Sequence, residues 1–184
     1  MSCLSPRKWS LEVTEIPHSD APDTLVRLYG PSVFKAAYRV LGDVAQAEDV
    51  AQDVFLRLIE ARPIQVDSWP AYLVSAAVRG AIDILRRKQR WWRLSRYLPD
   101  TKELSESPEQ LGIAYDRARL LRRALGKLPA REAQCFGLRY LQGFELSEIA
   151  HALGLSENSV NVALHRARKR LEAQILESNL GASE

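Results

Sequence analysis

Residues 146–165, LSEIAHALGLSENSVNVALH, constrain the fold of this chain more than any other segment. A small residue, Ala150, is followed four positions later by Gly154 and then by the β-branched Val160. A helix-turn-helix needs a small side chain where its helices cross and a turn residue that tolerates a positive φ, as glycine does. Ser156 is placed to cap the second helix. The pattern therefore predicts two helices joined by a tight turn.

The second helix of this motif is basic. It carries Arg166, Arg168, Lys169 and Arg170, with no acidic residue between Asn158 and Leu171. Recognition helices enter the major groove, where Asn and Arg read base edges and other cations hold phosphates. We expect DNA contacts from Asn161, His165, Arg166 and Arg168. The alternative is a solvated basic face on a helix hairpin, and the turn chemistry favours DNA binding over it.

Helical periodicity with clear stop signals fills most of the remaining chain. Asp23 is placed to cap a first helix that Gly42 ends. Its expected buried residues are Leu25, Leu28, Tyr29, Val33, Ala36, Ala37 and Val40. Asp43 and Gln46 suggest a capping box for a second helix, which runs to about Ala61. After a loop over 62–68, Ser68 or Asp67 caps a third helix, from about Trp69 to Arg90.

Composition changes after this third helix. Residues 94–110 contain two prolines, three serines and several carboxylates, with no firm apolar period, so we interpret them as an exposed linker. Helical patterning resumes near Leu111, and strand signals are nearly absent. The sequence predicts an all-α fold of two small helical domains joined by a flexible linker. The expected ranges are an N-terminal arm (1–20), a first domain (21–93), the linker (94–110) and a second domain (111–178).

Several function classes are disfavoured by the composition. Neither the two cysteines, Cys3 and Cys135, nor the three histidines have the spacing of metal ligands, and we expect no metal or cofactor. Cys135 sits in an apolar helical pattern and should be a buried, reduced thiol. No nucleophile–base pair or phosphate-cradling glycine loop appears, so we expect no enzymatic activity. No apolar run suits a membrane span or a signal peptide, so we expect a cytoplasmic protein without membrane insertion.

Two further helical segments carry polar patterns that a simple core does not explain. In residues 47–60, Asp49, Gln52 and Asp53 share one helix face, while Val50, Val54, Leu58 and Ala61 should be core. An acidic face is usually only solvated. However, residues 79–96, RGAIDILRRKQRWWRLSR, interleave cations with Trp91 and Trp92. Such a mixture suits a nucleic-acid backbone and unstacked bases, although tryptophans beside solvated arginines are the alternative.

Taken in order, these segments resemble an extracytoplasmic-function sigma factor over roughly residues 22–175. DVAQD is similar to the DLVQE-type motif of that family. The stretch from LPAREAQCFGLRYLQGFE through LSEIAHALGLSENSVNVALHRARKRL resembles the pattern of the family's C-terminal domain. The resemblance implies domains like sigma domains 2 and 4. It also implies a non-enzymatic subunit that directs RNA polymerase to promoters, with an anti-sigma factor as a further partner.

The resemblance also assigns roles. Asp49, Gln52 and Asp53 take the positions that dock on the clamp helices of the polymerase largest subunit. The polymerase flap is a second expected contact of the chain. Arg79, Arg86, Arg87 and Arg90 would follow the −10 element. Asn161, His165, Arg166 and Arg168 would meet the −35 element.

The chain departs from the family pattern at several positions. Arg79 stands where the family often has Asn, Asn158-Ser159 replaces Gly-Thr, Val162-Ala163 replaces Ser-Arg, and Glu145 replaces a common capping serine. The changes on the recognition helix and at Arg79 bear on the promoter sequence rather than on the fold. Two rival functions stay open at this point: a helix-turn-helix regulator that binds an operator without polymerase, and a helical adaptor or anti-sigma-like interaction protein.

Overall fold

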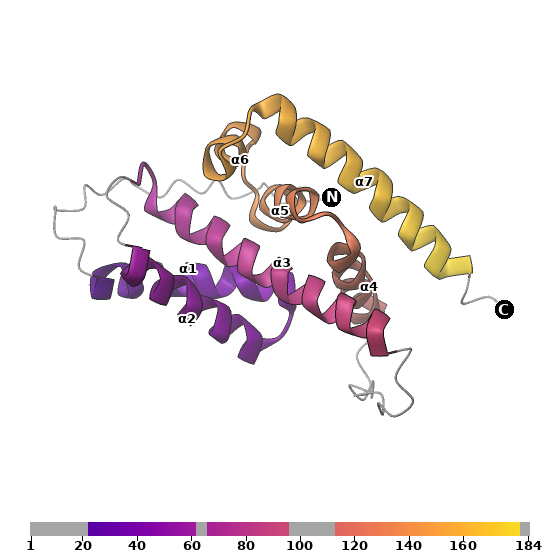
Figure 1. The fold of residues 1–184 in the computed structure, drawn as a ribbon, viewed down its shortest axis with the longest axis horizontal. Helices are drawn as coiled ribbons and strands as arrows, with labels where there is room; N and C mark the ends of the chain where they lie inside the picture. The colour runs from indigo at the N-terminus through magenta and orange to yellow at the C-terminus, as the bar shows by residue number, and fades with distance from the viewer. Residues whose placement is uncertain (1–21, 62–65, 96–112, 181–184) are drawn as a thin grey trace, which may run out of the picture.

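The computed structural model describes residues 22–61, 66–95 and 113–180. Over these residues every regular element is helical and none is a strand, which confirms the all-α prediction. In chain order (Figure 1) the elements are α1 (Pro22–Leu41), α2 (Val44–Ala61), α3 (Trp69–Ser95), α4 (Ile113–Lys127), α5 (Ala130–Phe136), the π-helical segment η1 (Gly137–Gln142), α6 (Leu146–Leu153) and α7 (Glu157–Leu180). The predicted arm, 1–20, and most of the predicted linker lie outside the described residues.

Helices α1, α2 and α3 pack against one another as an N-terminal unit. Gly42 ends α1 with a positive φ of 68°. The Asp43 carboxylate accepts a hydrogen bond from the Gln46 amide at 2.9 Å. The predicted capping box is only half formed, because the side-chain oxygen of Gln46 is buried with no hydrogen bond in the described part of the chain. Ser68, rather than Asp67, caps α3, since its hydroxyl accepts from the Ala71 amide at 3.4 Å.

Three sequence expectations for this unit were wrong. Leu28 is 52% exposed, because the inward stripe of α1 passes through Leu25 and Val33 and leaves Leu28 on its outer side. Ala61, in the last turn of α2, is also exposed. Helix α3 continues five residues beyond Arg90, so Leu94 and Ser95 belong to a helix and not to the linker.

Helices α4 to α7 form a C-terminal unit in which α7 contacts α4, α5 and α6. Cys135 of α5 is fully buried and free, as predicted. Burial raises the pKa of its thiol, which therefore stays protonated near neutral pH. Gly143, at a φ of 82°, ends η1, and the Phe144 amide donates to the Leu138 carbonyl at 3.0 Å.

The two units share a single continuous hydrophobic core. Helix α3 contacts α1 and α2, and it also contacts α4, α5, η1 and α6 of the C-terminal unit. In Figure 1 the shorter helices of the C-terminal unit lie between α3 and the long α7. The sequence predicted both units but gave no indication that they pack together.

Candidate nucleic-acid interface

The helix-turn-helix is formed by α6 and α7, as the sequence predicted. Gly154 takes a φ of 63° at the turn, and the Leu155 amide donates to the Ala150 carbonyl at 2.8 Å. The Ser156 hydroxyl accepts from the Ser159 amide at 3.2 Å, which caps α7. Val160 is fully buried beside these elements. The turn and the cap together fix which side of α7 faces outward.

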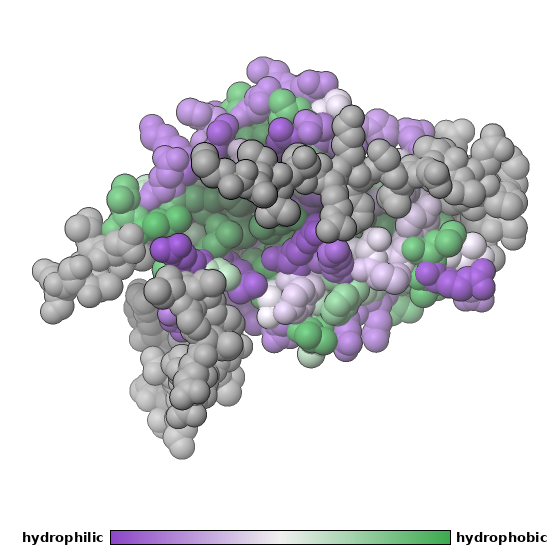
Figure 2. Space-filling view, turned by 180° about the vertical axis from the view of Figure 1, so that it is seen from behind, coloured by the Kyte–Doolittle hydropathy of each residue, from purple (hydrophilic) through white to green (hydrophobic). Residues whose placement is uncertain are grey.

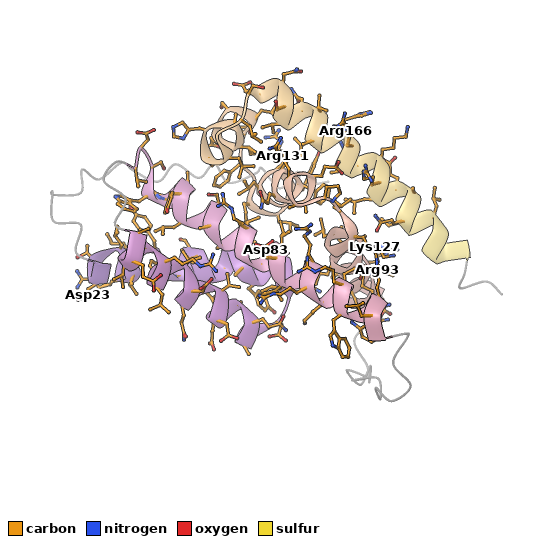
Figure 3. The ribbon with its side chains drawn as sticks, viewed as in Figure 1. Asp23, Asp83, Arg93, Lys127, Arg131 and Arg166 are labelled. Atoms are coloured by element: carbon orange, nitrogen blue, oxygen red, sulfur yellow. The ribbon has the colours of Figure 1, made fainter. Side chains whose placement is uncertain are left out.

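The outward side of α7 carries all the predicted −35 residues: Asn161, His165, Arg166 and Arg168 are exposed. None of the four has an ion pair within the part of the chain that the structure describes. Figure 3 shows Arg166 on this helix. Arg170 is different, because its Nε lies 3.1 Å from the Glu132 carboxylate of α5. An exposed row of cations with an amide and an imidazole can contact both phosphates and base edges.

The second half of α3 carries the other predicted DNA-binding residues. Arg79, Arg87 and Arg90 are exposed, and Arg86 is half-buried. The Asp83 carboxylate lies 3.9 Å from Arg86, so among the described residues it pairs with Arg86 and not with Arg79. Arg79 and Asp83 stand four residues apart on α3 but form no ion pair in the part of the chain that the structure describes.

Trp91 and Trp92 lie near the C-terminal end of α3. They are 46% and 40% exposed, and their rings pack edge to face with centroids 6.1 Å apart. They are therefore not enclosed in the core, although Trp92 makes a further contact within the chain. Exposed aromatic rings among cations suit stacking with unpaired bases.

On α2, the predicted docking residues Asp49, Gln52 and Asp53 are all exposed on one face. Asp53 pairs with Arg57 of the next turn at 2.9 Å. The same side continues into Leu56 and Ile59, which are 59% and 43% exposed. Neither was predicted from the sequence, although Leu56 stands three residues after Asp53 and Ile59 three residues after Leu56, a spacing that places them on one side of a helix. The combined face is acidic at one end and apolar at the other, as suits a protein partner.

These surfaces do not converge on one pocket. The structure places α2 and α7 on opposite sides of the molecule, with α3 between them (Figure 1). From behind, hydrophilic residues cover the upper edge, and hydrophobic residues reach the surface in separate patches (Figure 2). Among the residues that the structure describes, no group of His, Cys, Asp and Glu could hold a metal ion. The described helices include none that is long and apolar enough to cross a membrane.

Comparison with known proteins accounts for both units. Residues 25–91 match the model for sigma-70 region 2, and residues 118–171 match the model for sigma-70 region 4. The extracytoplasmic-function (ECF) RNA polymerase sigma factor SigW of Bacillus subtilis is 26% identical over 171 residues, which cover 85% of this chain and 89% of SigW. This chain belongs to the ECF sigma factor family.

Other members of the family agree with this assignment. The ECF sigma factor SigD of Mycobacterium tuberculosis is 33% identical over 134 residues, which cover 71% of this chain and 63% of SigD. The fold is similar to that of the sigma factor RpoE of Bartonella quintana, solved in complex with the anti-sigma factor NepR. The TM-score is 0.52 at 20% identity, covering 83% of this sigma factor and 95% of RpoE. We call residues 25–91 region 2 and residues 118–171 region 4 below.

Proposed function

We propose that this chain binds core RNA polymerase and directs promoter-specific initiation, with region 2 reading the −10 element and region 4 the −35 element. One observation carries the proposal: a single chain combines an acidic, partly apolar α2 face, a basic aromatic helix and a helix-turn-helix. A regulator that acts without polymerase would leave the α2 face and the basic aromatic helix unexplained. A helical adaptor would leave the basic recognition helix unexplained.

In this proposal Asp49, Gln52 and Asp53 dock on the clamp helices of the polymerase largest subunit, and region 4 approaches the flap. The support is their common exposure on α2, together with the match of DVAQD to the family motif. Charged residues on the exposed part of an interface steer association and set specificity more than they add affinity.

The basic half of α3 follows the −10 element as the strands separate. Arg86, Arg87 and Arg90 contact the backbone, and Arg79 borders the pocket for an unstacked base. Taking a base out of the stack costs a few kcal/mol, which stacking and pocket contacts offset. Catalysis belongs to the polymerase, so the sigma factor itself needs no catalytic residue or cofactor.

Helix α7 enters the major groove at the −35 element. Asn161, His165 and Arg166 are placed to read bases, while Arg168 is placed to hold phosphate. Polymerase and promoter DNA are cytoplasmic in bacteria, so we expect the protein to act there. The complex of RpoE with NepR further suggests that an anti-sigma factor regulates this chain.

Binding to a −35/−10 promoter fragment, with and without core enzyme, tests this function against the rivals. We expect the chain to shift the fragment strongly only when core polymerase is present. A specific shift of equal strength without core enzyme would favour the stand-alone regulator. The absence of any promoter binding under both conditions would favour the adaptor.

A further inference from the structure

The outward face of the recognition helix has an apolar side chain at its centre. Val162 is 41% exposed, and on a helix its surface neighbours are the residues three and four positions away. These are exposed polar residues: Asn158, Ser159, His165 and Arg166. The other large hydrophobic side chains exposed on the described part of α7, Ile175 and Leu176, lie more than three turns later.

The core fixes this orientation. Val160 is fully buried, and Ala163 and Leu164 are 6% and 3% exposed, so α7 cannot rotate without exposing its packed side. Valine in a helix strongly prefers one χ1 rotamer. The two methyl groups of Val162 are therefore held at the surface in a defined direction, with little side-chain entropy to lose on contact.

Thymine is the base that offers an apolar group in the major groove, its C5-methyl. We propose that Val162 selects thymine at one position of the −35 element. This inference rests on the proposed reading of that element by α7. It concerns a position where the chain has valine in place of the family's usual serine.

Replacing thymine by uracil removes only the C5-methyl, so it tests this contact directly. Each thymine of a −35 duplex, on both strands, would be replaced in turn, and binding of the holoenzyme measured. We expect one replacement to weaken wild-type binding about fourfold, the effect of one buried methyl group. Val162→Ala should lose that sensitivity, whereas the control Ile175→Ala should keep it.

Equal sensitivity to uracil in the wild type and Val162→Ala would overturn the inference, as would specific binding that no uracil replacement affects. If the wild type bound all duplexes alike, the proposed −35 function would fail as well. The two failures are therefore distinguishable.

Discussion

The Nε of Arg170 on α7 lies 3.1 Å from a carboxylate oxygen of Glu132 on α5, and the Glu132 side chain is only 10% exposed. The distance is that of an ion pair, although the same oxygen has no hydrogen bond of good geometry. The carboxylate therefore depends on Arg170 for compensation of its charge. The pair ties the recognition helix to the body of region 4.

Arg170→Ala should lower the free energy of unfolding by about 1–3 kcal/mol, because it leaves an enclosed carboxylate without its partner. Arg168→Ala is the matched control, since Arg168 is exposed and should change stability by less than about 0.5 kcal/mol. Urea denaturation compares the two. A similar stability for both variants would show that the pair does not hold the helix.

Asp53→Arg should weaken binding to core polymerase without unfolding the chain. Asp53 is exposed on the proposed docking face of α2 and pairs with Arg57 only at the surface. Charge reversal there should shift stability by less than about 0.5 kcal/mol, so circular dichroism should barely change. Glu172→Arg, an exposed reversal on α7, is the control. Undiminished holoenzyme assembly by Asp53→Arg would exclude this docking face.

Arg166→Ala should weaken recognition of the −35 element by about 1–3 kcal/mol, the value of a bidentate contact to guanine. Binding to specific and scrambled −35 duplexes across a range of salt concentrations measures it. A loss confined to the specific duplex supports base reading. An equal loss on both, with the salt slope reduced by about one, would mean a phosphate contact instead.

Arg79→Asn should change the base preferred at one position of the −10 element. Arginine offers a planar fork of donors, whereas asparagine offers a donor and an acceptor. Wild type should therefore favour guanine or another acceptor-rich edge. Asp83 pairs with Arg86 and not with Arg79, so loss of a surface ion pair does not complicate the result. Binding to promoters that are varied at each −10 position measures the preference of wild type and variant. A uniform loss of binding, or no change, would contradict a role for Arg79 in base reading.

Local signals in the sequence predicted most of the elements. Gly42 and Gly154 adopt the positive φ values that their positions suggested, and Ser156 caps α7. These features depend on residues within one or two turns, so a single sequence carries them. The extension of α3 to Ser95 was missed because the serines and prolines of residues 95–108 resemble a linker. Trp91 and Trp92 nevertheless continue the helix.

Long-range contacts had no such signal. Gln142 bonds to Ala36 across 106 positions, and the pairing of Glu132 with Arg170 depends on how α5 and α7 cross. Each residue alone fits an ordinary solvated position. For the candidate site, charge and periodicity predicted that Asp49, Arg87 and Arg166 are exposed, as they are in the structure. The exposure of Leu56 and Val162 was missed because an apolar residue in a helix is ordinarily assigned to the core.

In vitro transcription on a library of genomic fragments tests the central claim most directly. Core RNA polymerase would be assayed with and without this chain, and start sites mapped. We predict new starts that share a −35 and a −10 element at constant spacing and disappear when the chain is omitted. An identical set of start sites with and without the chain would contradict its function as a sigma factor.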